Sequence, residues 1–339
     1  MKESYMIYEF LKNSMKVREN EEEKVEKLLN DQNINEIMFN SYDNIYCEIN
    51  NKIVRERNIF ENKEQYHRFV SSLLSENNII VNESFPIVDF SIGKDLRVNI
   101  IKDTISQNDL VLSIRRRKKD IIKIDSLCKN NFATIDVLNF LINEMKNKKN
   151  IFISGETSTG KTTLLNALLK ELSEEERIII IEDTKEIQLP SNYNAINLVS
   201  KEKIYDSKEV SISDLIKTSL RMRPDRIILG EIRREEVLQY IHALNTGHSG
   251  SICTGHSKSG QDMVNRLIML LLEQNIPLPA IKLQLGRSID YIVHLTRNKN
   301  SRRLEAIDSV NFKNDEIILE TIMKYDKYKG EYNYKKYTN

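Results

Sequence analysis

The sequence predicts two domains, a small α+β domain followed by an α/β domain whose parallel sheet is covered by helices on both faces. Three observations predict this. The chain has 339 residues, more than one ordinary hydrophobic core accommodates. In the first third of the chain, short segments that alternate polar and apolar residues, as strands do, precede and follow a predicted helix. In the later part, near-continuous apolar strands alternate with amphipathic helices. Between them, residues 118–132 are polar and basic, as in a linker.

Composition and charge narrow the class of protein. Hydrophobic residues make up 40% of the chain, enough for packed interiors, and no apolar run approaches the length of a membrane-spanning helix. The first twenty residues lack the pattern of an export signal. Three distant cysteines without metal-ligand spacing are typical of reduced cytosolic thiols, so we expect a cytoplasmic protein. A net charge of +1 disfavours an extensive nucleic-acid-binding surface.

The first domain is expected over residues 31–117, after an N-terminal helical segment at residues 1–30. The runs INEIMFN, NIYCEIN and KIVRERN, separated by Asn, Asp and Ser turns, predict antiparallel strands. A helix is expected at KEQYHRFVSSLLSEN, and further strands at PIVDFSI, LRVNII and LVLSIRRR. Three interpretations of the basic run that begins at Arg115 remain open. It is a solvated charge run, it contacts nucleotide phosphates or another subunit, or it contacts anionic lipid.

The second domain is expected over residues 133–339. A helix from Ala133 to Met145 precedes a strand that begins at Ile151, and further buried strands are expected at RIIIIED, RIILGE and GSICTGH. Each strand ends in a small, acidic or histidine residue, and ligands gather at the carboxyl edge of such a sheet. A buried helix at MVNRLIMLLLEQ, a strand at DYIVHLTRN and a terminal hairpin follow, and the Tyr/Lys-rich end is expected to fray.

The most specific motif is IFISGETSTGKTT at residues 151–163, which contains G-x-x-x-x-G-K-[ST] between a strand and a helix. Two glycines let the loop turn tightly so that main-chain N–H groups surround phosphates, and the helix adds its positive end. Lys161 can reach the β- and γ-phosphates, and Thr162 can ligate Mg²⁺. The motif predicts that a nucleoside triphosphate such as ATP binds to Gly155, Glu156, Thr157, Ser158, Thr159, Gly160, Lys161, Thr162 and Thr163.

Acidic residues follow two predicted strands. Glu182, Asp183 and Glu186 form the first cluster, and Glu231 in IILGEIRREE is the second. Phosphoryl transfer needs charge neutralisation and a group that orients the attacking water, so these carboxylates are candidates, although each can instead be a surface charge at a strand end. The aspartate that usually precedes such a glutamate is replaced by Gly230. Mg²⁺ is therefore expected to rest on Thr162, the phosphates and water, with the first cluster as a further candidate.

Two histidines and several arginines lie near the second acidic strand. His248 and His256 flank the strand-like SGSICTG, so we expect them near opposite ends of one strand rather than on one metal. His256, at the carboxyl end, is the better active-site candidate. The arginines of SLRMRPDRIILGEIRR either bind phosphates or form salt bridges, and they are Arg221, Arg223, Arg226, Arg233 and Arg234.

Four ordered segments resemble the sequence boxes of the secretion-superfamily ATPases, which power tight-adherence and type IV pili or type II and type IV secretion. They are GETSTGKTTLLNALL, RIIIIEDTKEIQL, RMRPDRIILGEIR and NTGHSGSICTGHSKSG. The resemblance implies a RecA-like P-loop NTPase domain, a hexameric ring on the cytoplasmic face of a membrane, nucleotide held between the two domains, and a membrane platform protein as partner. A glycine at position 230 is normal in this group. The group also has a glycine close before the segment RVN, and this chain departs from that pattern because three residues separate Gly93 from Arg97.

The resemblance also implies roles residue by residue. Lys161 and Thr162 correspond to the phosphate and Mg²⁺ contacts, and Arg97 and Arg115 correspond to basic positions of the N-terminal domain that approach the nucleotide. The acidic and histidine boxes supply the catalytic candidates, which are Glu231, implicated in activating water, and Glu186, Glu182, His256 and His248.

The predicted activity is hydrolysis of ATP to ADP and phosphate, coupled to motion between the two domains. A nucleic-acid-translocating ATPase of the conjugation type shares the loop and the ring, but the sequence has no pervasive basic surface or aromatic stacking platform. A nucleotide-gated assembly protein that does not hydrolyse ATP is a second alternative. A small-molecule kinase is disfavoured because no lid or acceptor pocket is evident.

Overall fold

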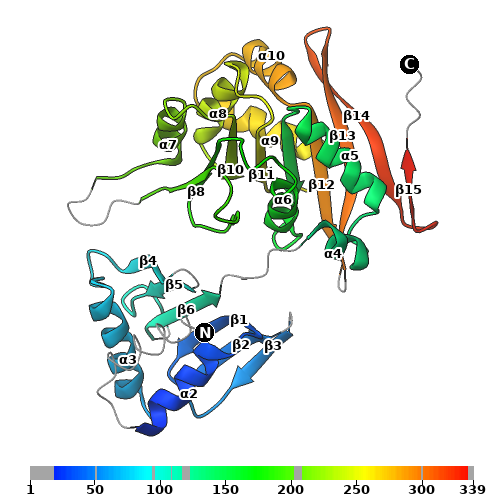
Figure 1. The fold of residues 1–339 in the computed structure, drawn as a ribbon. Coiled ribbons are helices and arrows are strands. Elements are labelled where there is room, and N and C mark those ends of the chain that lie inside the picture. Colours follow the sequence, from blue (N-terminus) through cyan, green and yellow to red (C-terminus); the bar gives the residue numbers. More distant parts are fainter. Residues whose placement is uncertain are drawn as a thin grey trace. The chain divides into compact units, whose positions relative to one another are not determined.

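The computed structural model describes residues 19–49, 52–93, 96–107, 109–116, 123–201, 208–298 and 301–334. The chain divides into two compact units, Met1–Asp120 and Ile121–Asn339 (Figure 1). Of the segment expected to be helical at residues 1–30, the described part begins with helix α2 (Glu19–Asn30). Among the described helices, none is both long enough and apolar enough to cross a bilayer.

The first unit is a six-stranded antiparallel sheet in the order β3-β2-β1-β6-β5-β4. Helices α2 and α3 pack on one face of it, where Val25 and Val70 meet alternate strand residues such as Phe39, Val98 and Ile114. Its remaining elements are β1 (Ile34–Ser41), β2 (Asn44–Ile49), β3 (Lys52–Glu56), α3 (Lys63–Glu76), β4 (Ile87–Ile92), β5 (Leu96–Ile101) and β6 (Val111–Arg116).

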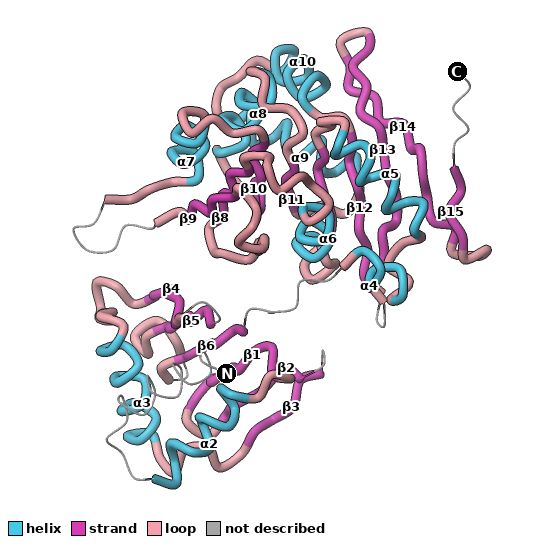
Figure 2. The backbone as a smooth tube through the Cα atoms, in the orientation of Figure 1, coloured by secondary structure: helices cyan, strands magenta, loops and turns pink. Residues whose placement is uncertain are grey.

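The second unit is a nine-stranded sheet with helices on both faces (Figure 2). Its strands are β7 (Ile151–Gly155), β8 (Ile178–Glu182), β9 (Ala195–Val199), β10 (Arg226–Ile232), β11 (Ile252–Gly255), β12 (Tyr291–Arg297), β13 (Arg302–Lys313), β14 (Glu316–Asp326) and β15 (Glu331–Tyr334). Its helices are α4 (Ile124–Lys129), α5 (Ile135–Lys146), α6 (Lys161–Leu169), α7 (Ile212–Ser219), α8 (Glu236–Asn245), α9 (Gly260–Leu272) and α10 (Leu278–Ser288).

Two cores lie on the two faces of this sheet. The strand order is β15-β14-β13-β12-β7-β11-β10-β8-β9, and the strands from β12 to β9 run parallel. Along β7, Ile151 and Ile153 pack in the core beneath α4, α5 and α6, whereas Phe152 packs in the core beneath α7 to α10. This alternation makes β7 fully buried, which is why the strand reads as a continuous apolar run. The predicted fold class, an α/β domain preceded by a smaller α+β domain, is confirmed.

Three local features differ from the sequence-based expectations. Residues 118–132, expected as a linker, contain helix α4, whose Ile124 and Leu127 are buried in the second unit. Strand β9 was not expected, because it is a half-buried edge strand without a continuous apolar run. The expectation of fraying is wrong for β15, which pairs with β14 and buries Tyr332, whose hydroxyl donates to the carbonyl of Leu304 at 2.6 Å.

Arg226 anchors the start of β10 inside the second unit. Its side chain is fully buried, and its guanidinium donates to the carboxylate of Glu176 at 2.5 and 3.2 Å. It also donates to the carbonyls of Met145 and Gly250, each at 2.8 Å. Lys148 lies 2.7 Å from the same Glu176 carboxylate. Of the two alternatives left open for Arg226, the salt bridge is therefore the one observed.

We expect Arg226→Met to lower the free energy of unfolding of the second unit by about 3–5 kcal/mol, because it leaves two buried carbonyls without their donor and the Glu176 carboxylate with Lys148 alone. Calorimetric thermal unfolding measures this loss. The matched control is Arg221→Met, since Arg221 is exposed. Equal unfolding midpoints for the two variants would contradict an anchoring role for Arg226.

Candidate active site

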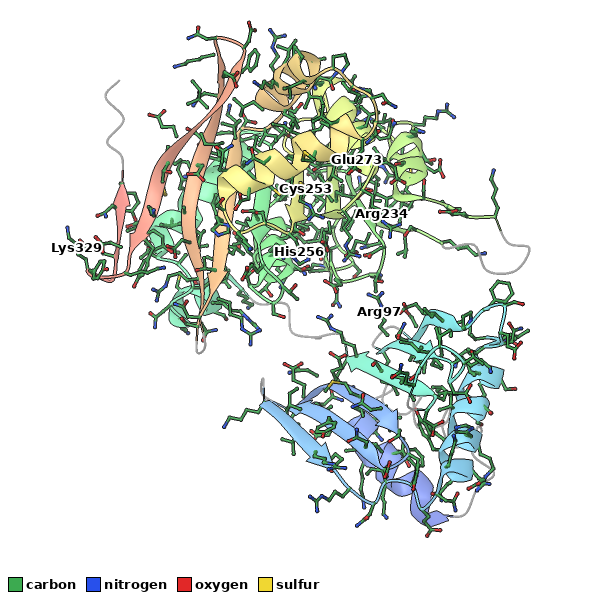
Figure 3. The ribbon with its side chains drawn as sticks, turned by 180° about the vertical axis from the view of Figure 1, so that it is seen from behind. Arg97, Arg234, Cys253, His256, Glu273 and Lys329 are labelled. Atoms are coloured by element: carbon green, nitrogen blue, oxygen red, sulfur yellow. The ribbon has the colours of Figure 1, made fainter. Side chains whose placement is uncertain are left out.

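Four neighbouring parallel strands bring polar groups to one edge of the second sheet. In the order β7-β11-β10-β8, their carboxyl ends carry the phosphate loop, His256, Glu231 and Glu182. Figure 3 labels His256 just beyond Cys253, which lies inside β11. Because parallel strands end at a common edge, groups far apart in the sequence meet here.

The loop after β7 has the backbone that the motif requires. A β-carbon on Gly155 would lie 2.7 Å from the carbonyl oxygen of Leu295 and 2.7 Å from the hydroxyl of Thr159, so only glycine fits. Gly160 caps α6 with a φ of +98°, in the left-handed region that favours glycine. Ser158 also has a positive φ of 62°. These turns aim the start of α6, with its unpaired main-chain amides, at the concave side of the loop.

Lys161 curls back over this loop. Its ammonium donates to the carbonyls of Gly155 at 2.9 Å and Glu156 at 3.0 Å, and the residue is only 8% exposed. Burial lowers the pKa of Lys161, while the carboxylates of Glu231 and Glu186 act in the opposite direction. The cation is therefore held at the loop by main-chain oxygens and by nearby negative charge.

Glu186 lies next to the first turn of α6. The hydroxyl of Thr162 donates to Glu186 Oε2 at 3.2 Å. Asn166 holds the segment that carries Glu186, because its side-chain oxygen accepts a hydrogen bond from the amide of Gln188 at 2.8 Å. A hydroxyl and a carboxylate at the N-terminus of a helix form a small oxygen-rich corner.

This corner fits Mg²⁺ as P-loop proteins hold it. Mg²⁺ prefers oxygen ligands, keeps several waters and needs only one or two protein groups besides substrate phosphates. Thr162 and Glu186 supply those oxygens. No group of three or more His, Cys, Asp or Glu side chains within the described ranges forms a complete metal cage.

Glu182, at the end of β8, is buried and shapes the turn that follows it. Its Oε1 accepts from the amides of Glu186 and Ile187, each at 2.9 Å, whereas its Oε2 is buried and has no hydrogen-bond partner among the described residues. Burial raises the pKa of Glu182 to about 7, although the two amide hydrogen bonds favour the ionised form. A β-carbon on Gly230 would lie 3.0 Å from Glu182 Cγ. The missing side chain at position 230 thus leaves room for Glu182.

His256 stands between Lys161 and Glu231. Its Nδ1 lies 3.3 Å from the ammonium of Lys161, and its Nε2 lies 3.0 Å from Glu231 Oε1. Glu231 Oε1 is buried and has no hydrogen-bond partner within the described structure. Burial, followed by the charge of Lys161, holds the pKa of His256 below its ordinary value. The ring is therefore neutral near pH 7.

Arg233 connects the two acidic strands. Its guanidinium donates to Glu231 Oε2 and to Asp183 Oδ2, each at 2.6 Å. The hydrogen bond to Glu231 raises the pKa of this guanidinium further. Sequence reasoning did not single Arg233 out from its four neighbours. The available signal was its spacing from Glu231, because residues i and i+2 of an extended segment point to the same side.

Of the remaining candidates, His248 lies away from this cluster within the second unit. His248 precedes β11, at the opposite edge of the sheet, where its Nδ1 lies 3.2 Å from the carbonyl of Ala243. Arg97 and Arg115 belong to the first unit, where they are directly opposite each other on β5 and β6. Their face of that sheet is opposite to the one that α2 and α3 cover, and Arg97 Nε donates to Asp89 at 3.2 Å. The basic residues after Arg116 lie outside the described residues.

Comparisons with known proteins agree with this architecture. A family model described as "Type II/IV secretion system protein" matches residues 18–325. An uncharacterized protein of Methanocaldococcus jannaschii is 34% identical over 66% of this chain and 32% of its own length. Conjugal transfer protein TrbB of Rhizobium radiobacter is 34% identical over 58% of this chain and 58% of its own length. The chain thus spans 32% of the length of the first relative and 58% of the length of the second.

A solved structure shows the same fold. The ATPase DotB of Yersinia pseudotuberculosis has a TM-score of 0.60, with 18% sequence identity, over 88% of this chain and 81% of that chain.

Glu182→Gln should change how stability depends on pH. The buried Glu182 keeps its proton in the folded state up to a pKa of about 7, whereas the unfolded chain releases it above the ordinary glutamate pKa of 4.5. Wild-type protein should therefore lose stability relative to Glu182→Gln as the pH rises from about 4.5 to 7, by on the order of 3 kcal/mol. Glutamine still offers an oxygen to both amides. Thermal unfolding between pH 5 and 8 tests this, and parallel curves for the two proteins would contradict it.

Proposed function

Because the chain belongs to the type II/IV secretion system protein family, we propose that it is an ATP-hydrolysing motor of a secretion or pilus-assembly machine. The observation that carries this proposal is the contact between three strand ends. The ammonium of Lys161 lies 3.3 Å from one nitrogen of His256, and Glu231 lies 3.0 Å from the other. A phosphate-binding cation and a carboxylate suited to water activation are thus separated by a single imidazole ring.

Nucleotide binding is assigned to the loop from Gly155 to Thr163. Main-chain amides of the loop and the start of α6 receive the α- and β-phosphates. Lys161 exchanges its two carbonyl contacts for oxygens of the β- and γ-phosphates. Mg²⁺, when bound by Thr162 and Glu186, supplies further neutralisation of phosphate charge.

Glu231 orients the attacking water and accepts its proton. Its buried Oε1 has no hydrogen-bond partner within the described ranges, and its Oε2 is held by Arg233. The carboxylate is therefore fixed in direction while one oxygen remains available to water. The neutral ring of His256 lies between Lys161 and Glu231, so it separates the ammonium from the carboxylate that activates water.

The coupling to motion involves the first unit. Arg97 and Arg115 form a cross-strand pair of cations on β5 and β6, with Asp89 3.2 Å from Arg97. We assign them to contacts with nucleotide phosphates, so that ATP favours a closed arrangement of the two domains and hydrolysis releases it. A hexameric ring at the cytoplasmic face of a membrane, engaging a platform protein there, completes the proposal.

Movement of DNA is a second candidate function. It is favoured by the relative named as a conjugal transfer protein. Steady-state ATP turnover of the purified chain, alone, with lipid vesicles and with DNA, separates the two, and the mass in solution tests the ring. Strong, salt-sensitive stimulation by DNA would favour DNA movement.

Lys161→Ala is expected to abolish detectable binding of ATP, because it removes the cation that faces the phosphates. Calorimetric titration with Mg²⁺ and ATP measures this. Undiminished affinity in a folded Lys161→Ala protein would contradict the assigned phosphate site.

Glu231→Gln is expected to retain ATP binding but to lower turnover by about 10²–10⁴-fold, the usual worth of a general base. The matched control is Glu235→Gln, four residues further on, where the side chain is exposed. Turnover should be unchanged in the control. Wild-type turnover in Glu231→Gln would remove this residue from the mechanism.

A further inference from the structure

The hairpin of β12 and β13 lies next to the phosphate loop, on the side of β7 away from His256. Strand β7 is flanked by β12 on one side and by β11 on the other. Leu295 of β12 pairs with Gly155, the last residue of β7, and β12 continues to Arg297. The end of β12 therefore lies level with the loop that follows β7.

Arg302, the first residue of β13, packs against the turn between this loop and α6. Its Cδ lies 3.7 Å from the point that a β-carbon on Gly160 would occupy. Phe132 Cε2 lies 3.5 Å and Thr163 Cβ 4.0 Å from the same point. The aliphatic part of Arg302 thus flanks the junction at which the loop becomes helix.

The backbone of β13 is held in place two residues after Arg302. The amide of Leu304 donates to the carbonyl of Phe132 at 2.9 Å, and the side chain of Leu304 is fully buried in the core beneath α6. Alternation along β13 puts Arg302 on the same face as Leu304. The guanidinium carbon of the next residue, Arg303, lies 3.8 Å from the ring centroid of Tyr325.

The end of this hairpin is cationic. Arg302 is directly opposite Arg297, and side chains directly opposite in an antiparallel pair lie on one face. A guanidinium presents several fixed donors and binds phosphate oxygens more specifically than an ammonium does.

We propose that Arg302 is a nucleotide-binding residue that contacts the α-phosphate end of ATP or ADP. Lys161 is directed at the opposite end of the loop, toward Gly155 and Glu156, where the β- and γ-phosphates are assigned. The junction near Gly160 and Thr163 is left for the α-phosphate, which ATP and ADP share. This proposal rests on the proposed function, because it needs a nucleotide on the loop.

Since Arg302 contacts the α-phosphate, which substrate and product share, it stabilises bound ATP, the transition state and bound ADP equally. It therefore contributes to affinity and not to the rate of the chemical step. The test is Arg302→Met, which keeps the packing stem next to Gly160 and removes the guanidinium. We expect the Kd of both ATP and ADP, and the KM for ATP, to rise by about tenfold, the order of one charge-assisted hydrogen bond, with kcat unchanged. Arg302→Lys should recover part of this affinity. Arg303→Met is the matched control and should bind both nucleotides as the wild type does.

Calorimetric titration with each nucleotide and Mg²⁺, steady-state kinetics and thermal unfolding of every variant together decide the outcome. Arg302→Met that binds both nucleotides within twofold of wild type overturns the proposal. A fall in kcat with unchanged Kd, or an equal loss of affinity in Arg303→Met, overturns it as well. Wild-type protein that binds no nucleotide instead overturns the proposed function, so the two failures are distinguishable.

Discussion

The parallel pairing of β7 between β11 and β12 is the constraint on which the site depends. It brings the carbonyl of Leu295 so close to Gly155 that no side chain fits there, and the chain must turn at this point. On the other side, Gly255 pairs with the residue before Gly155, so His256 emerges next to the ammonium of Lys161. The apolar residues that bury β7 on both faces therefore determine, through register, which polar groups meet at its end.

The polar groups at this edge form a series in which each inner member contacts two neighbours. Lys161 is followed by His256, Glu231, Arg233 and Asp183, with successive separations of 3.3, 3.0, 2.6 and 2.6 Å. Cations and carboxylates offset one another along the series, and the neutral ring separates the ammonium from the first carboxylate. Any change of charge at one member alters the electrostatics of both neighbours. Burial strengthens this coupling between Lys161 and Glu231, because charges interact more strongly where water is excluded, whereas Arg233 and Asp183 are exposed.

The strands and the phosphate loop could be predicted because their signals are local. A run such as the four isoleucines of β8 is buried on both faces, and the glycine-lysine pattern marks its own turn. The roles of the arginines could not be predicted, since burial depends on distant partners. Arg226 is buried because Glu176, fifty residues away, neutralises it, whereas Arg233 is exposed and reaches both acidic strands. Helix α4 was missed because only two of its residues are buried, too few to produce a periodic pattern.

Glu182 on β8 and Gly230 on β10 lie on paired strands and compete for the same volume. The Glu182 side chain occupies the volume into which any side chain at position 230 would project, with only 3.0 Å between Cγ and that β-carbon. The two positions therefore cannot both hold large residues in one packed sheet. An aspartate introduced at position 230 would therefore need a shorter or differently directed side chain at position 182. The glycine is thus explained by steric exclusion from the volume of a neighbouring strand, without any part in the reaction.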